Sequence, residues 1–337
     1  MRTPVTLITG AGGEIGHGLI EHFKSLGREI VALDLKEVDE SLQASCQASI
    51  VGNILDEELL QRLVTEYEIW EIYHLAALLS TRAEYAPVQA HRVNVEGTLN
   101  LLQLAHEQSR WHGHSVKFLF PSSIAAYGIP DRATKTTVGK VRETEYAFPS
   151  TIYGCNKLYC EQLGRYFTLH FQQLAAEQVT SGVDFRALRF PGLISAATVP
   201  SGGTSDYVPG MIHAAAQGEA YECFVDADAR LPFMAMPDAI RALAMLADAS
   251  ADALTQRVYN ITSFSVTAGE MREQVLGEFP EADITFVRDE PRGRIVDSWP
   301  GDVDDGAARS DWNWSPELGL DGALTDYVFP GVRSRYA

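Results

Sequence analysis

Apolar residues along this chain form two kinds of pattern. Short apolar runs predict buried β-strands at residues 5–9, 29–33, 49–51, 71–77, 116–120 and 185–190. Between the runs, apolar residues recur at helical spacing. This spacing predicts helices that end near residue 26 and that cover residues 56–67, 93–108 and 156–177.

Strands that alternate with helices predict an α/β fold with a Rossmann-type, doubly wound parallel sheet. The alternation breaks after Phe190, where the chain becomes rich in Gly, Ser, Thr and Pro. We expect residues 1–190, with about 235–262 returning to them, to form the Rossmann domain. Residues 191–234 and 263–337 should then form a small C-terminal lobe over the carboxyl ends of the strands, where such sheets bind ligands.

Composition narrows the class of protein. Of the 337 residues, 46% are hydrophobic and 21% charged, which is ordinary for a soluble globular protein. A net charge of −18 argues against a nucleic-acid partner, because phosphate backbones attract basic surfaces. No apolar run approaches the roughly twenty residues needed to span a membrane. The chain also enters a strand at Val5 without room for a signal peptide, so we expect a cytoplasmic protein.

Cysteine and histidine spacing gives no metal or disulfide signal. The four cysteines lack zinc-ligand spacing and the density of a disulfide scaffold. His112 and His114 have no third ligand at a suitable distance along the chain, so a solvated loop is the simpler interpretation. We therefore predict no metal site.

A glycine loop follows the first predicted strand and opens the first helix. Its glycines are Gly10, Gly13 and Gly16, and they allow a tight turn whose backbone N–H groups approach a pyrophosphate. Asp34 ends the second strand, where a carboxylate binds the ribose hydroxyls of NAD and repels the 2′-phosphate of NADP. Nearby Lys36 weakens this preference, but NAD remains the predicted cofactor.

The other predicted cofactor contacts lie beside the glycines or after later strands. Small or polar residues at these positions also fit an alternative in which they simply close a strand. They are Glu14, Ile15, Asn53, Ile54, Leu75, Ala76, Ala77, Asn94 and Pro191.

Tyr153 and Lys157 lie four residues apart, on one face of a predicted helix. A lysine ammonium beside a phenol favours the phenolate and lowers the ordinary tyrosine pKa of about 10. Such a tyrosine is a usable general base, and both residues should also contact the cofactor. Ser122 and Ser123 end the fifth strand, where a hydroxyl can hydrogen-bond the reacting substrate oxygen and orient Tyr153. Together these residues predict hydride transfer between a nicotinamide and a substrate C–OH group.

The same motifs resemble a known superfamily. Residues 10–16, Asp34, residues 121–128 and the Tyr153–Lys157 pair are similar to the extended short-chain dehydrogenases/reductases, which include UDP-sugar epimerases and dehydratases. Several further stretches resemble the short-chain-type L-threonine 3-dehydrogenases. These stretches are residues 74–80, 188–195, 202–207, 230–234, 297–300, 304–305, 308–309 and 311–314.

The resemblance implies a substrate and a site. It implies that NAD oxidises the β-hydroxyl of L-threonine to give 2-amino-3-oxobutyrate. Tyr153 would be the base, and Trp299 would line the amino-acid pocket unless it is a core residue that fixes the tail. By position, the catalytic residues would be Ser123, Tyr153 and Lys157, and the substrate contacts Ser80, Ser122, Ser123, Tyr153, Gly192, Thr204 and Trp299.

The sequence also departs from that family. Ser123 stands where Thr is common, a change that keeps the hydroxyl. The segments 109–114, 129–148 and 172–182 look longer than usual. Two of them extend the helices that form the dimer interface in related dehydrogenases, so we expect an altered interface. A monomer is our hypothesis, and a family-type dimer is the alternative.

Two other functions fit parts of the pattern. An NDP-sugar 4-epimerase would use the same scaffold but keep its NAD bound without net release of NADH. A non-catalytic, NAD-sensing binding protein usually lacks the tyrosine or the lysine, and this chain has both Tyr153 and Lys157.

Overall fold

The structure, a computed structural model, describes residues 3–175, 182–200 and 203–337. Within them, a parallel sheet of seven strands has the order β11-β7-β5-β4-β1-β2-β3. From β1 the chain builds outward to β3 on one side, then crosses to β4 and builds outward on the other, as a doubly wound fold requires. The predicted Rossmann-type fold is confirmed. The strands are β1 (Pro4–Thr9), β2 (Ile30–Asp34), β3 (Ala48–Val51), β4 (Glu68–His74), β5 (Val116–Ser123), β7 (Val183–Phe190) and β11 (Val258–Asn260).

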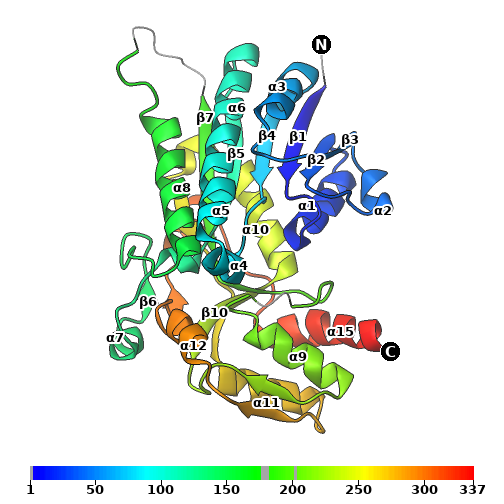
Figure 1. Cartoon of the computed structure of the whole chain (residues 1–337), viewed down its shortest axis with the longest axis vertical. Helices are drawn as coiled ribbons and strands as arrows, with labels where there is room; N and C mark the ends of the chain where they lie inside the picture. The colour runs from blue at the N-terminus through cyan, green and yellow to red at the C-terminus, as the bar shows by residue number, and fades with distance from the viewer. Residues whose placement is uncertain (1–2, 176–181, 201–202) are drawn as a thin grey trace.

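Helices cover both faces of this sheet (Figure 1). Successive side chains of β1 point to opposite faces, so Leu7 belongs to the core that α3, α6 and α8 share, while Ile8 belongs to the core that α1 and α10 share. Both residues are fully buried. The helices of this region are α1 (Glu14–Ser25), α2 (Glu40–Gln43), α3 (Glu57–Glu66), α4 (Ser80–Tyr85), α5 (Pro87–His91), α6 (Gly97–His112), α8 (Ile152–Leu169), α10 (Met236–Asp248) and α13 (Gly306–Trp312).

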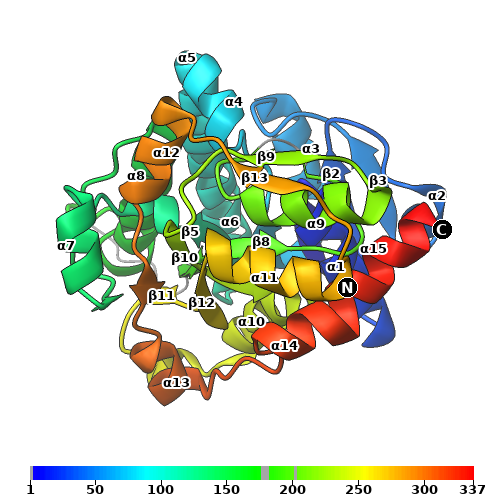
Figure 2. The same cartoon turned by 90° about the horizontal axis from the view of Figure 1, so that it is seen from below.

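A smaller lobe lies beyond the carboxyl ends of the strands, and Figure 2 shows its helices in front. It has a hydrophobic core of its own, which includes Phe233 and Trp299. Its strands are β8 (Gly192–Ile194), β9 (Tyr221–Cys223), β10 (Arg230–Ala235), β12 (Phe264–Thr267), β13 (Ile284–Phe286) and β14 (Asp302–Val303). Its helices are α9 (Tyr207–Gln217), α11 (Ala268–Glu278), α12 (Glu290–Asp297), α14 (Leu320–Gly322) and α15 (Phe329–Tyr336).

Residues 129–148, which we call the bridging segment, leave the sheet region and lie against the small lobe. The segment contains helix α7 (Arg132–Thr137) and strand β6 (Lys140–Val141), and β6 pairs in parallel with β14. The Ile129 N–H donates to the Ser298 carbonyl at 2.7 Å, next to Trp299. A stretch that looks like an insertion in the sequence is therefore part of the lobe's framework.

The structure differs from the predicted elements at several places, including the ends of the fourth strand and of helix α8, and it adds the short helices α4 and α5. The fourth strand begins at Glu68 and ends at His74, so Leu75, Ala76 and Ala77 form a loop after it. Helix α8 ends at Leu169 and not near residue 177, and Gln172 then adopts a left-handed φ of 51°. Residues 176–181 of the third lengthened segment lie outside the described residues. Among the described helices, none combines the length and apolar character needed to cross a membrane.

Candidate active site

The start of helix α8 presents Tyr153 and Lys157 to the end of strand β5. The Thr151 hydroxyl caps the helix by accepting from the Gly154 N–H at 3.0 Å. A Cβ atom at Gly154 would lie 2.0 Å from the Ala125 carbonyl oxygen, so only glycine lets the helix pack this closely on the turn after β5. This close packing fixes the positions of Tyr153 and Lys157 relative to the end of β5.

Tyr153, Ser123 and Lys157 lie together at this point. The Ser123 and Tyr153 side chains are hydrogen-bonded, and the Ser123 oxygen also accepts from the Ala125 N–H at 3.1 Å. The Lys157 ammonium lies 5.5 Å from the centre of the Tyr153 ring and donates to the Pro121 carbonyl at 2.6 Å. The three residues predicted to be catalytic are therefore neighbours.

The electrostatics of this group differ from the sequence expectation. Burial raises the pKa of Tyr153, and the hydrogen bond with Ser123 lowers it. The prediction that Lys157 lowers the Tyr153 pKa is not supported, because the ammonium points to the Pro121 carbonyl. Burial also lowers the pKa of Lys157 to about 8, against the nearby Cys160 and Glu161, which raise it.

Ser122 faces away from Ser123, into the protein. Its hydroxyl donates to the Glu161 carboxylate at 2.5 Å, and the side chain is 2% exposed. Glu161 in turn binds Arg189 through two hydrogen bonds, of 2.9 and 2.7 Å. The hydroxyl of Ser122, which was predicted to contact the substrate, is thus bonded within the protein in this structure. The sequence could have indicated that Ser122 and Ser123 point in opposite directions, because neighbouring side chains on a strand face opposite sides of the sheet.

The glycine loop packs against the ends of β2 and β4. Gly10 has a φ of 68°, and a Cβ there would lie 2.6 Å from the Ala76 nitrogen. A Cβ at Gly16 would lie 2.4 Å from the Ala11 carbonyl oxygen, so both positions require glycine. The Gly12 N–H donates to the Asp34 carboxylate at 3.0 Å, which places Asp34 beside the loop as predicted from its spacing.

Beneath the loop, buried polar side chains hold the chain after β4. Asn94 bonds the backbone of Leu78 at both its N–H and its carbonyl, at 2.8 and 3.0 Å, and contacts Asn156 of α8 at 3.3 Å. His74 lies between the Thr9 and Thr98 hydroxyls, at 2.8 and 3.0 Å. Burial lowers the His74 pKa to about 3, so the ring is neutral. Asn94 was predicted to contact the cofactor, and in the structure it holds the loop that carries Leu75, Ala76 and Ala77.

Asn53 and Ile54 follow β3 and differ from each other. Asn53 is exposed and caps a turn by accepting from the Leu55 N–H at 3.0 Å. The Ile54 side chain is 5% exposed and touches the position where Gly97 lacks a side chain. Ile54 is therefore mainly a packing residue, and Asn53 is the more accessible of the two.

Four parts of the chain carry the remaining residues predicted for the substrate side, and one of these parts also carries Pro191, a predicted cofactor contact. The Thr204 N–H donates to the Ser80 hydroxyl at 3.4 Å, which joins the loop before α9 to helix α4. Pro191 and Gly192 are buried where β7 leaves the sheet, and Gly192 leaves room for the Phe233 ring. Trp299 is 4% exposed, and its indole N–H has no hydrogen-bond partner among the described residues.

Glu14 and Ile15, at the start of α1, complete the predicted cofactor contacts. Ile15 is partly buried and packs against the core on the α1 side of the sheet. Burial raises the pKa of Glu14, and the charge of Asp206 raises it further. Since Asp206 belongs to the small lobe, the glycine loop and the start of α9 lie near each other.

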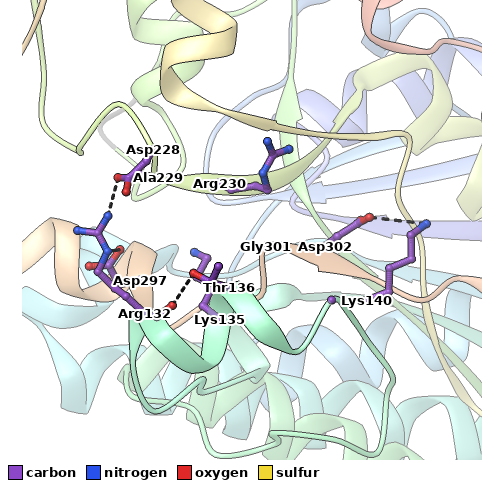
Figure 3. A pocket seen from close by; sticks show the side chains of 11 residues that line it. Arg132, Lys135, Thr136, Lys140, Asp228, Ala229, Arg230, Asp297, Gly301 and Asp302 are labelled. Carbon is purple, nitrogen blue, oxygen red and sulfur yellow. Dashed lines mark hydrogen bonds and ion pairs between the residues drawn. The ribbon is translucent and has the colours of Figure 1, made fainter.

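A separate pocket of about 400 Å³ lies between the bridging segment and the small lobe (Figure 3). Its charged side chains pair across it: Arg132 contacts Asp228 at 2.5 Å, and Lys140 contacts Asp302 at 3.6 Å. Lys135 donates to the Val296 carbonyl at 2.8 Å. The lining residues differ from the predicted site residues, and their pairing indicates a contact between segments of the chain.

The fold and the site can now be compared with known proteins. The model of the NAD dependent epimerase/dehydratase family matches residues 6–262. The mitochondrial L-threonine 3-dehydrogenase of Bos taurus is 35% identical over 334 residues, which cover 98% of this chain and 84% of that protein.

Solved structures agree with this match. The L-threonine dehydrogenase of Phytophthora infestans superposes with a TM-score of 0.85 and 32% identity, covering 98% of this chain and 99% of that one. A monomeric L-threonine 3-dehydrogenase from a metagenome gives a TM-score of 0.84 and 32% identity, covering 99% of this chain and all (100%) of that one.

Proposed function

Since the chain belongs to the NAD dependent epimerase/dehydratase family, we propose that it oxidises the 3-hydroxyl of L-threonine to give 2-amino-3-oxobutyrate. The observation that carries this proposal is the grouping of Ser123, Tyr153 and Lys157 at the end of β5, in a chain similar along its length to L-threonine 3-dehydrogenases. Such a group removes a proton from a C–OH while the carbon loses a hydride.

The residues around the glycine loop fit a dinucleotide. A Cβ atom at Gly13 would meet only the Gly10 carbonyl oxygen, at 3.3 Å, so the loop leaves open space at its outer edge for a pyrophosphate. Asp34 would accept from the ribose hydroxyls, which favours NAD over NADP. The remaining parts of the NAD molecule would contact Asn53, Ala76 and the start of α8. When bound, NAD supplies the nicotinamide that accepts the hydride.

Tyr153 would act as the general base, and Ser123 would hold both the Tyr153 oxygen and the substrate oxygen. Because burial raises the pKa of the phenol, the base needs help to lose its proton. The hydrogen bond with Ser123 supplies part of that help. The charge of Lys157 and the positive charge of the cofactor ring would supply more once the site is filled.

The small lobe would bind the amino acid. Trp299 carries a buried indole N–H without a partner among the described residues, and such a donor costs free energy unless something accepts from it. A threonine carboxylate fits this need. Ser80 and Thr204, which already contact each other, would add hydroxyl and backbone groups to the same pocket. Gly192 would lie beside the nicotinamide. We propose the boundaries 191–234 and 263–337 for this lobe, and 1–190 with 235–262 for the NAD-binding domain.

One assay tests the substrate and the cofactor together. Purified protein is mixed with NAD and L-threonine, and NADH is followed by its absorbance; L-serine, L-allo-threonine and UDP-glucose are parallel substrates. We expect NADH to form with L-threonine. If NADH forms only with another β-hydroxy compound, the substrate assignment is wrong. Turnover of UDP-glucose without formation of NADH would indicate an epimerase.

We also propose that the protein is a monomer. Phe171, just after α8, stacks on Phe167 with ring centres 4.4 Å apart and contacts His106 of α6 at 4.5 Å. The chain thereby covers one end of the α6–α8 face with its own residues. A relative of 32% identity is itself described as monomeric, which supports the same state here.

A further inference from the structure

A buried carboxylate lies one helical turn beyond Lys157. Glu161 is fully buried, and the same oxygen accepts from the Ser122 hydroxyl at 2.5 Å and from Arg189 at 2.9 Å. Its second oxygen accepts from Arg189 at 2.7 Å. Removing either partner of such a pair would leave an uncompensated charge in the interior, which costs more than the pair itself contributes to stability. The presence of this buried pair therefore does not by itself indicate that it stabilises the fold, and another role for Glu161 has to be considered.

The position of Ser122 suggests that role. Ser122 lies between Pro121, whose carbonyl accepts from Lys157, and Ser123, whose hydroxyl bonds Tyr153. Glu161, Lys157 and Tyr153 recur every four residues along α8, so all three approach the end of β5 from the same helix face. Any movement of Ser122 would displace both of its neighbours.

Arg189 anchors this arrangement to the rest of the sheet. It lies directly opposite Ser122 in the pairing of β5 with β7. Its guanidinium also donates to the Glu143 carbonyl at 2.9 Å and stacks on the Tyr127 ring at 4.6 Å. Glu161 therefore ties helix α8 to two adjacent strands at the point where the proposed chemistry takes place.

We propose that Glu161 is a positioning residue: through Ser122 it fixes the end of β5, and with it the Lys157 and Ser123 groups that serve Tyr153. This inference rests on the proposed function of the Tyr153 site.

Glu161 also acts on Lys157 by its charge. The other titratable groups around Lys157 are Tyr153, Cys160 and His74. Burial raises the Cys160 pKa to about 11 and lowers that of His74 to about 3, so both are neutral near pH 7. Cys160 and Glu161 both oppose the loss of the Lys157 proton, so removal of the Glu161 charge should lower the Lys157 pKa further.

Two substitutions separate the positioning effect from the charge effect. Ser122→Ala breaks the bond to β5 but leaves the Glu161–Arg189 pair intact, so the protein should fold. Glu161→Gln removes the charge and keeps the size. Ser109→Ala is the matched control, because it removes another buried serine hydroxyl, which donates to the His106 carbonyl of helix α6 at 2.7 Å. The measurement is the single-turnover rate of NADH formation, with the KM for L-threonine and the Kd for NAD determined separately.

We expect Ser122→Ala to slow the single-turnover rate roughly tenfold, as for loss of one hydrogen bond to a charged group, with KM and Kd within about twofold of wild type. In Glu161→Gln, the pH at which the rate declines on the alkaline side should also move lower, which a merely structural role would not cause. An unchanged rate in Ser122→Ala, or a loss equal to that of Ser109→Ala, would overturn the inference. The wild-type assay distinguishes this failure from failure of the proposed function: if another substrate reduces NAD, the same rate ratios are measured with it.

Discussion

The Lys157 ammonium donates to the Pro121 carbonyl at 2.6 Å, so a helix residue is held by the end of a neighbouring strand. This bond directs the charge at the backbone of β5 while keeping it 5.5 Å from the Tyr153 ring. Tyr153 therefore depends on Ser123 and on a filled site for its acidity, and Lys157 carries its charge at a cost to the folded state.

Tyr153→Phe removes the proposed base and keeps the ring. The rate of L-threonine oxidation should fall by roughly 10²–10⁴-fold, the usual contribution of a general base, while NAD still binds. Tyr159→Phe is the matched control, because Tyr159 lies on the same helix and is 53% exposed. Steady-state kinetics and NAD titration by protein fluorescence measure the two effects. If Tyr153→Phe keeps wild-type turnover, the base is another residue.

Lys157→Met should change how stability depends on pH. The folded state releases the Lys157 proton at a pKa of about 8, whereas an exposed lysine keeps it to 10.5. The folded pKa is depressed, so folding carries a penalty that is complete below pH 8 and disappears as the pH rises toward 10.5. At pH 7 the variant should therefore be more stable than wild type by roughly 1–3 kcal/mol. Urea unfolding at pH 7 and pH 10 measures this difference, and a gap that stays constant over that range would contradict the argument.

Asp34→Ser should weaken the preference for NAD. Asp34 accepts from the Gly12 N–H beside the glycine loop, where its charge would repel a 2′-phosphate. We expect the ratio of kcat/KM for NAD to that for NADP to fall about tenfold or more, a change of about 1.4 kcal/mol. Asp39→Ser, at an exposed carboxylate before α2, is the control. An unchanged ratio would refute the role of Asp34.

Lys135→Met should raise the KM for L-threonine. Its ammonium donates to the Val296 carbonyl at 2.8 Å, at the end of the helix that precedes Trp299. Loss of this bond frees the end of α12, and the expected rise is about fivefold, as for one hydrogen bond. Lys140→Met removes a second lysine from the same segment, whose contact with Asp302 is more exposed, and should leave KM within about twofold. Equal effects of the two substitutions would argue against positioning of Trp299 by Lys135.

Light scattering coupled to gel filtration tests whether the protein is a monomer in solution. We expect the mass of one chain at micromolar concentration. Phe171→Ala uncovers the end of the α6–α8 face and should promote association if Phe171 is what blocks it. A wild-type mass near that of two chains would contradict the proposal.

Local patterns in the sequence predicted much of the fold and the first layer of the site. Tyr153 and Lys157 could be paired because four residues correspond to about one helical turn. The glycine loop could be recognised because close backbone approaches at Gly10 and Gly16 exclude residues with a side chain. Both signals are contained in a few neighbouring residues. The parallel, doubly wound sheet also followed from the alternation of strands and helices.

Contacts between distant residues could not be predicted in this way. Glu161 and Arg189 are 28 residues apart and meet only because α8 packs on β7. The end of α8 was missed because no glycine or proline marks it, and the chain instead turns at Gln172. Helices α4 and α5 were missed because both are short, and a span of five or six residues gives little periodicity to read.

The pairing of β6 with β14 has a consequence for attempts to alter this protein. It joins residues 140–141 to residues 302–303, so the small lobe is assembled from pieces supplied early, midway and late in the chain. A lobe built in this way cannot be cut out and exchanged as a cassette with that of a relative. Recombination at a single crossover would separate strands that must pair. Retargeting the enzyme therefore calls for point substitutions within the pocket, made in a chain that stays whole.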